Sequence, residues 1–156
     1  MEKATFGAGC FWGVELTFQQ LPGVIETAVG YAGGKHDNPS YQEVCTDRTG
    51  HAEVVDILFD PAKLTYSALL DAFFSLHDPT QLNRQGPDWG TQYRSVIFYH
   101  SPQQQQAALE TIERLTKEHK FSKPIVTQVV SAQTFWRAEE YHQKYLEKRG
   151  VTSCHI

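Results

Sequence analysis

Cys10 is the residue of this sequence whose type and setting best suit covalent chemistry. It lies in the segment GAGCFWG, residues 7–13, where a strand-like stretch changes to the residue spacing of a helix. The two glycines before it permit a tight turn and leave the thiol open to approach. At a helix start, unpaired N–H groups and the helix dipole favour the thiolate, which is the nucleophilic form. A buried, inert cysteine is the ordinary alternative, and position alone leaves both open.

A dinucleotide site uses a similar turn, but the rest of that pattern is missing. In G-x-G-x-x-G the third glycine follows the second by three residues, whereas Gly13 comes one residue late. Phe11 and Trp12 fill the stretch that would face the pyrophosphate, and no acidic residue ends the next expected strand, 24–32. We therefore expect no dinucleotide at this turn.

Two aromatic side chains directly follow the thiol. Phe11 lies on the apolar face of an expected helix, 11–21, where core packing is its ordinary role. Trp12 lies off that face, at what we expect to be the exposed start of the helix. The two rings could also form an apolar cage for a methyl group bonded to sulfur.

Glu53 is a candidate proton donor. On an expected strand, 53–59, it has the same parity as Val55, Ile57 and Phe59, so it shares an apolar face with them. Burial there would raise its pKa and keep it protonated near neutral pH. A glutamate turned to solvent at the strand end is the alternative.

Other polar side chains lie in turn-rich segments. Tyr41 and Tyr93 are phenol donors, and Asp88 lies in a loop, 77–92, which is long enough to suggest a functional role. Half-buried packing for the tyrosines and a turn-forming role for Asp88 are the ordinary alternatives.

The cysteines are few and odd in number. Cys10, Cys45 and Cys154 do not suggest a disulfide framework, and no close Cys or His pairs suggest a metal site. A cysteine oxidised to a sulfenic acid condenses readily with a second thiol. Cys154 is the best resolving candidate, because the tail, about residues 150–156, is expected to be mobile; an uninvolved thiol is the alternative. We expect Cys45, next to Val44, to be buried and inert.

Composition limits the class of protein. With 156 residues, 40% hydrophobic and 21% charged, the chain is expected to be a single catalytic domain, 1–156, carrying that tail. A net charge of −4 and the absence of a basic cluster argue against a nucleic-acid partner. No apolar run is long enough to cross a membrane, and no signal-peptide pattern begins the chain. We therefore expect a cytoplasmic monomer.

The order of the expected elements predicts the fold class. The first six follow the βαββαβ order of ferredoxin-like domains. This predicts an α+β two-layer sandwich, with a mixed sheet and helices on one face. The expected strands are 4–7, 24–32, 53–59, 93–99 and 126–132, and the expected helices are 11–21, 66–76, 102–119 and 138–148.

Several ordered segments together resemble the A-type peptide methionine sulfoxide reductases. The resemblance covers nearly the whole chain, which makes it far more specific than a single glycine motif. The segments are GCFWG at 9–13, GVIETAVGYAGG at 23–34, SYQEVC at 40–45, TGHAEVV at 49–55, HDPTQLNRQGPDWGTQYRS at 77–95 and FWRAEEYHQKYL at 135–146.

This resemblance implies reduction of methionine S-sulfoxide, free or in oxidised proteins and peptides, as repair of oxidative damage. It implies thioredoxin as the external reductant of a Cys10–Cys154 disulfide, with no resident cofactor. The implied roles are nucleophile for Cys10, methyl contact for Phe11 and Trp12, proton delivery for Glu53, oxygen binding for Tyr41 and Tyr93, and a pocket-lining role for Asp88.

Two other functions compete with this interpretation. A Cys–His hydrolase would pair Cys10 with His51 or His142, although papain-like and caspase-like signatures are missing. Such an enzyme would release acid from esters without consuming reductant. A non-enzymatic module that binds methionine-containing peptides through Phe11 and Trp12 would tolerate Cys10→Ser.

Overall fold

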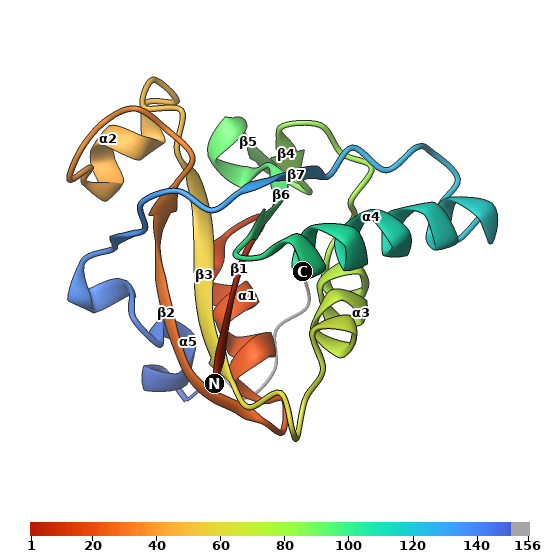
Figure 1. Cartoon of the computed structure of the whole chain (residues 1–156). Coiled ribbons are helices and arrows are strands. Elements are labelled where there is room, and N and C mark those ends of the chain that lie inside the picture. Colours follow the sequence, from red (N-terminus) through yellow and green to blue (C-terminus); the bar gives the residue numbers. More distant parts are fainter. Residues whose placement is uncertain (151–156) are drawn as a thin grey trace.

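A mixed β-sheet organises residues 1–150, the part of the chain that the computed structural model describes (Figure 1). Cys154 and the remainder of the expected tail lie outside the described residues. In chain order the elements are β1 (Glu2–Ala8), α1 (Phe11–Gln19), β2 (Val24–Ala32), α2 (Tyr41–Cys45), β3 (Ala52–Phe59), α3 (Tyr66–Leu76), β4 (Arg84–Gln85), β5 (Asp88–Trp89), the 3-10 helix η1 (Thr91–Tyr93), β6 (Ser95–Tyr99), α4 (Pro102–Lys117), β7 (Gln128–Ser131), β8 (Trp136–Arg137), the 3-10 helix η2 (Glu140–His142) and α5 (Tyr145–Lys148).

The strand order of the main sheet is β7-β6-β1-β3-β2-β8. Strand β1 lies between β3 and β6 and is antiparallel to both, and β3 is antiparallel to β2. These four strands, with α1 and α3 between them in the chain, form the split βαβ arrangement of a ferredoxin-like domain. Strand β7 adds parallel to β6 and makes the sheet mixed. The predicted α+β fold class is confirmed.

Helices α1, α3 and α4 contribute side chains to the larger core, on one face of the sheet. Strand β3 shows how the two faces divide. Its Val55, Ile57 and Phe59 join the helix-covered core, whereas Ala52 and Val54 belong to the opposite face. This alternation follows from the period of two along a strand. Glu53 has the parity of the helix-covered set, as predicted.

The face opposite the helices is covered by the segment that follows β7. Figure 1 shows this segment, in blue, crossing from β7 toward β2. Its Ala132 and Phe135 pack against a buried group that includes Val96 and Phe98. At Gly30 in β2, an added Cβ would lie 2.4 Å from the carbonyl oxygen of Trp136. Glycine is therefore required there for the close approach of the C-terminal segment.

The predicted last helix, 138–148, is wrong. The segment instead forms η2 and the short α5, because its polar side chains bond to distant elements. The Gln143 amide accepts from Val29 N (2.8 Å) and donates to Val29 O (2.9 Å). Lys144 has a left-handed φ of 51°, which interrupts any helix that continues through it. Local spacing indicated a helix, but bonds to β2 determine the conformation.

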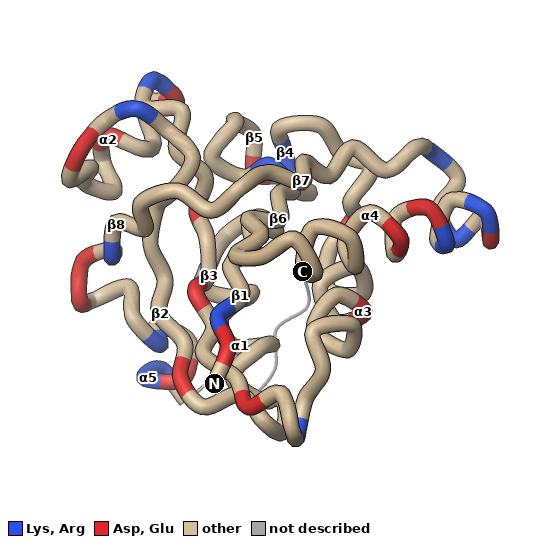
Figure 2. Tube along the Cα trace, viewed as in Figure 1, with Lys and Arg blue, Asp and Glu red and all other residues tan. Residues whose placement is uncertain are grey.

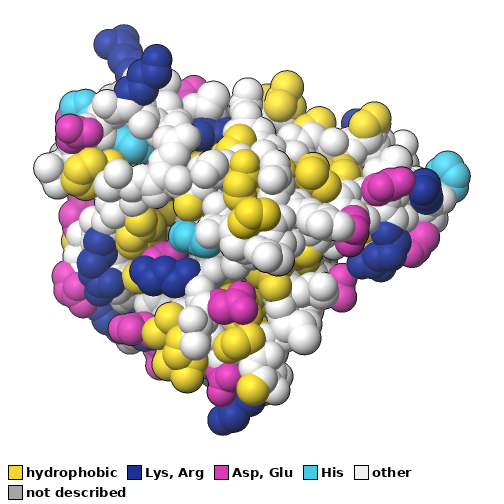
Figure 3. Space-filling view, in the orientation of Figure 1, with side chains coloured by type: hydrophobic (Ala, Val, Ile, Leu, Met, Phe, Trp, Pro, Cys, Tyr) yellow, Lys and Arg dark blue, Asp and Glu magenta, His cyan; other side chains and the backbone are white. Residues whose placement is uncertain are grey.

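The surface of the described residues carries interspersed charges of both signs. Figure 2 shows Lys and Arg close to Asp and Glu near α2 and at the end of α4. On the face shown in Figure 3, hydrophobic side chains lie in separate small groups among polar atoms. None of the helices within residues 1–150 is long and apolar enough to cross a membrane.

His77 attaches the end of α3 to β6. Its Nδ1 lies 2.6 Å from Phe73 O and its Nε2 lies 2.8 Å from Ser95 Oγ. Since Phe73 O can only accept, Nδ1 carries the proton and Nε2 accepts from the serine hydroxyl. Burial lowers the pKa of His77 to about 4. The imidazole is therefore neutral in the folded chain across the physiological range.

We predict that His77 makes the fold sensitive to acid. Because its folded pKa of about 4 lies below the ordinary value of 6.5, the unfolded chain takes up the proton first as the pH falls. Stability is therefore lost as the pH drops from 6.5 toward 4. In urea titrations, we expect His77→Gln to remove about 2 kcal/mol of the decrease in unfolding free energy between about pH 7 and about pH 5. His119→Gln, at an exposed histidine, is the control. An unchanged pH dependence in His77→Gln would contradict this account.

Candidate active site

The candidate site lies at the C-terminal end of β1, where the chain turns into α1. Cys10 is the N-cap of α1, as predicted, and is partly buried. Gly9 has a φ of 99°, a conformation that favours glycine, and a Cβ there would lie 3.0 Å from Gln85. The thiol is thus placed at the positive end of the helix dipole, which favours the thiolate.

Glu53 lies directly beneath this turn. In the antiparallel pairing of β1 with β3, Phe6 is opposite Val55, so the end of β1 meets the start of β3. Glu53 is 1% exposed, and its Oε1 accepts from Phe11 N at 3.3 Å. The side chain faces the interior, as the strand parity predicted; the solvent-facing alternative is wrong.

The pKa of Glu53 is raised to about 7, mainly by burial and to a smaller extent by the charge of Asp88. Hydrogen bonds from Gln92 and from Phe11 N oppose the shift but do not cancel it. A substantial fraction of the carboxyl groups therefore keeps its proton at neutral pH. A buried acid next to a helix-capping thiol is the arrangement that general-acid catalysis needs.

Gln92 is a residue of the site that the sequence analysis missed. It is 3% exposed, and its Nε2 donates to Glu53 Oε2 at 3.0 Å. The same nitrogen lies 3.7 Å from Cys45 Sγ. The one feature of the sequence that pointed to Gln92 was its position at the end of the long loop, 77–92, which was expected to be functional.

The expectation that Cys45 is buried is wrong, because Val44 fills the buried position of the short helix α2 and Cys45 is exposed. The contact with Gln92 nevertheless places its sulfur at the edge of the site.

Tyr41 and Tyr93 also come to this site, from α2 and η1. Tyr93 lies in η1 and not in the predicted strand, which begins at Ser95. Burial raises the pKa of both phenols, and the charge of Glu53 raises each further. Both therefore remain hydrogen-bond donors. Gln92, next to Tyr93 in η1, donates to Glu53 Oε2, which places η1 beside the acid.

The β4–β5 hairpin directs Asp88 and Trp89 to opposite sides. Gln85 pairs with Asp88, and Arg84 pairs with Trp89, so each pair shares one face of the hairpin. The Gln85 side chain lies against Gly9, which places the Asp88 face toward the catalytic turn. Trp89 is 68% exposed, with the Arg84 guanidinium 3.9 Å from its ring centroid. Asp88 therefore belongs to the site and Trp89 lies outside it.

Phe11 and Trp12 form an aromatic group with the C-terminal segment. Phe11 is 1% exposed, and its ring centroid lies 5.8 Å from that of Tyr31, so it packs against β2. Trp12 is partly buried rather than exposed, because its indole stacks on Tyr145 with ring centroids 3.9 Å apart. Its Nε1 donates to His142 Nδ1 at 2.9 Å. From the sequence, His142 was considered only as a partner of Cys10 in the competing hydrolase hypothesis.

These bonds argue against a Cys–His hydrolase. His51 has both ring nitrogens bonded to backbone: Nδ1 accepts from Gly34 N at 3.0 Å, and Nε2 lies 2.6 Å from His36 O. His142 directs Nδ1 to Trp12. In both rings Nδ1 accepts a hydrogen bond, so the proton lies on Nε2 and no acceptor nitrogen remains to act as a base for Cys10. Within residues 1–150, no group of three or more His, Cys, Asp or Glu side chains could hold a metal.

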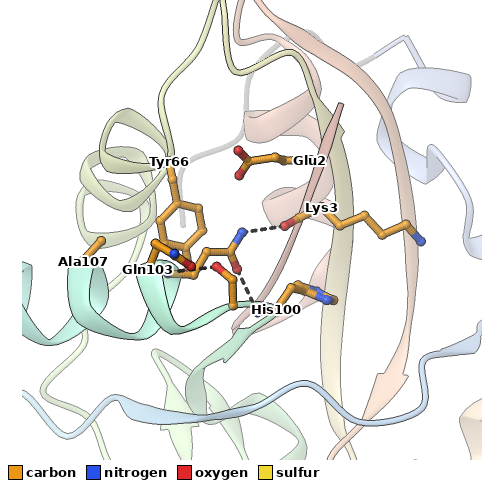
Figure 4. A pocket seen from close by; sticks show the side chains of 8 residues that line it. Glu2, Lys3, Tyr66, His100, Gln103 and Ala107 are labelled. Atoms are coloured by element: carbon orange, nitrogen blue, oxygen red, sulfur yellow. Dashed lines mark hydrogen bonds between the residues drawn. The ribbon is translucent and has the colours of Figure 1, made fainter.

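A cavity of about 460 Å³ lies at the other end of the molecule (Figure 4). It is lined by Glu2 and Lys3 at the start of β1, and Gln104 donates to Lys3 O there at 2.8 Å. Cys10 follows the opposite end of β1, about 20 Å away for a strand of this length. The cavity is therefore separate from the candidate site.

Comparison with known proteins agrees with this geometry. The family model "Peptide methionine sulfoxide reductase" matches residues 2–156. A "Peptide methionine sulfoxide reductase MsrA" of Acidobacterium capsulatum is 71% identical over 156 residues, covering 100% of both chains. The solved structure of methionine sulfoxide reductase A of Corynebacterium diphtheriae has a TM-score of 0.91 at 40% identity, over 98% of this chain and 77% of that one.

Mxr1 from Saccharomyces cerevisiae in complex with Trx2 has a TM-score of 0.65 at 25% identity, over 92% of this chain and 84% of that one. This likeness and those to the bacterial proteins extend over most of both chains. The chain therefore belongs to the peptide methionine sulfoxide reductase family.

Proposed function

We propose that this chain reduces methionine S-sulfoxide to methionine, with Cys10 as the nucleophile and Glu53 as the proton donor. The substrate is free or part of an oxidised protein or peptide, so the activity is repair. The observation that carries the proposal is the buried carboxyl of Glu53, 1% exposed and bonded to the backbone N–H of the residue after Cys10.

The first step balances as an oxygen transfer. The Cys10 thiolate attacks the sulfoxide sulfur, and Glu53 gives its proton to the oxygen. The S–O bond of the substrate breaks and an S–O bond to Cys10 forms, which releases methionine and leaves a sulfenic acid. The substrate sulfur gains the two electrons that the Cys10 sulfur loses.

Polar and aromatic side chains hold the substrate for this step. The hydroxyls of Tyr41 and Tyr93 bind the sulfoxide oxygen, where negative charge develops before the proton arrives. Their raised pKa values support this role, since both phenols keep the proton to be donated. Phe11 and Trp12 contact the methyl group, and Asp88 lines the pocket.

A second thiol regenerates the enzyme. We assign this step to Cys154: its thiol condenses with the Cys10 sulfenic acid, water leaves, and a disulfide forms. A thioredoxin dithiol then reduces the disulfide by exchange. The complex of yeast Mxr1 with Trx2 supports this class of partner. Because the external dithiol supplies both electrons, the proposal includes no resident cofactor. It further includes one catalytic domain acting as a cytoplasmic monomer.

The thiol assignments are tested by a rapid-quench assay without reductant. We expect the wild type to form about one equivalent of methionine from the S epimer and none from the R epimer. Cys10→Ser should form none, because the nucleophile is missing. Cys154→Ser should complete a single turnover but fail to turn over repeatedly with thioredoxin.

Mass mapping of the wild type after that turnover should find a Cys10–Cys154 disulfide. A Cys10–Cys45 disulfide would contradict the role of Cys154, and an active Cys10→Ser protein would contradict the mechanism.

The role of Glu53 is tested by the pH dependence of the first step. Burial raises its pKa to about 7, so the fraction that holds the proton decreases as the pH rises through 7. We expect the single-turnover rate to fall on that side of the profile. In Glu53→Gln the fall should disappear, and at acidic pH the rate should be lower by about a hundredfold or more. If the single-turnover rate of Glu53→Gln still falls as the pH rises through 7, another group donates the proton.

A further inference from the structure

One polar contact fixes the edge of the Trp12 indole. The Trp12 Nε1 donates to His142 Nδ1 at 2.9 Å. An indole N–H can only donate, so His142 must accept through Nδ1 and is a neutral imidazole. His142 is 1% exposed, which makes this bond an internal one. Only another hydrogen-bond acceptor at the position of His142 Nδ1 could replace this bond.

The same imidazole contacts the other aromatic walls of the site. Its ring centroid lies 5.2 Å from Phe11, 5.6 Å from Trp12 and 4.6 Å from Tyr41. These three side chains are the ones proposed to surround the methyl group and the oxygen of the sulfoxide. His142 thus lies directly behind the pocket wall.

Neighbouring residues hold His142 in a fixed position. On one side, Glu139 accepts from Tyr41 N at 3.0 Å, which joins η2 to α2. On the other side, the Gln143 amide bonds to both backbone groups of Val29 in β2. The position of the imidazole is therefore set by β2 and α2, together with α1, where Glu15 accepts from Lys144 N at 2.6 Å.

The indole is held between two constraints. Tyr145 stacks on its face with an interplanar angle of 11°, and His142 binds its edge. Stacking alone permits the ring to slide and turn in its own plane, since ring–ring contacts tolerate offset geometries. The hydrogen bond removes that freedom and selects one position of the ring edge.

We propose that His142 is a positioning residue that fixes the Trp12 indole against the substrate's methyl group and so sets the preference for methyl sulfoxides. The inference rests on the proposed function. A pocket wall that cannot move discriminates against one added methylene by about 10- to 200-fold. A wall that can slide accommodates the larger group, so the loss of the bond should reduce this discrimination.

The test compares methionine sulfoxide with ethionine sulfoxide as substrates. His142→Leu fills similar volume but lacks an acceptor. We expect it to raise KM for methionine sulfoxide by about five- to tenfold, the effect of one lost hydrogen bond, with kcat changed by less than about twofold. The methyl-to-ethyl ratio of kcat/KM should fall. His142→Asn should restore KM and the ratio, because its amide oxygen can occupy the position of Nδ1.

His100→Leu is the matched control. It removes an imidazole that bonds to Thr5 Oγ1 at 2.8 Å in the distant cavity region, and it should leave KM and the ratio unchanged. If His142→Leu does not fold, His142→Gln replaces it, since the longer side chain carries its oxygen beyond the Nδ1 position. The proposal is overturned if His142→Asn is as impaired as His142→Leu or His142→Gln.

A double-mutant cycle shows whether His142 acts through Trp12. Trp12→Phe keeps a ring but lacks the N–H donor, so His142→Leu should have little further effect in that background. Equal losses in both backgrounds would assign His142 a structural role only and overturn the inference. A wild type that reduces neither sulfoxide would contradict the proposed function instead, so the two failures are distinguishable.

Discussion

The site depends on a carboxyl group that is buried without a cationic partner among residues 1–150. Glu53 lies on the helix-facing side of β3, where its neighbours are apolar, and burying an unpaired charge there is costly. Retaining the proton removes most of that cost, and donors from Gln92 and Phe11 N satisfy the two oxygens. Three elements, β3, α1 and η1, must therefore meet at one point. The same burial that makes the charged form of Glu53 unfavourable raises its pKa to about 7, so the group can act as an acid near neutral pH.

The ferredoxin-like strand order explains why Cys10 meets this acid. Since β1 and β3 are antiparallel neighbours, the end of β1 and the start of β3 lie together. Periodic patterns were enough to predict this part of the fold. The expected strand 24–32 and helix 66–76 match β2 and α3 residue for residue, because apolar periodicity and clear stops bound both. The parity of Glu53 likewise predicted its burial.

Local sequence patterns do not predict the conformation where side chains bond to distant backbone. Glu139 and Gln143 have a spacing compatible with a helix, yet they bind Tyr41 N and Val29. Such bonds involve residues about a hundred positions apart, and they leave no trace in local periodicity. Gln92 was missed because its bond to the Glu53 side chain also leaves no local pattern. Cys45 was misplaced because α2 is too short for its burial pattern to be predicted.

The two parts of the site therefore have different structural origins. Cys10 and Glu53 are positioned by β1, β3 and α1, which belong to the ferredoxin-like core. The aromatic wall depends on the segment that crosses back over β2, where Gly30 permits its approach and Lys144 N donates to Glu15 at 2.6 Å. In the proposed mechanism the reaction takes place at the core, and the docked segment supports Trp12, one of the two rings that contact the methyl group. Because the bonds that hold this segment involve specific side chains, we expect changes in it to alter substrate selectivity while the nucleophile and its acid stay in place.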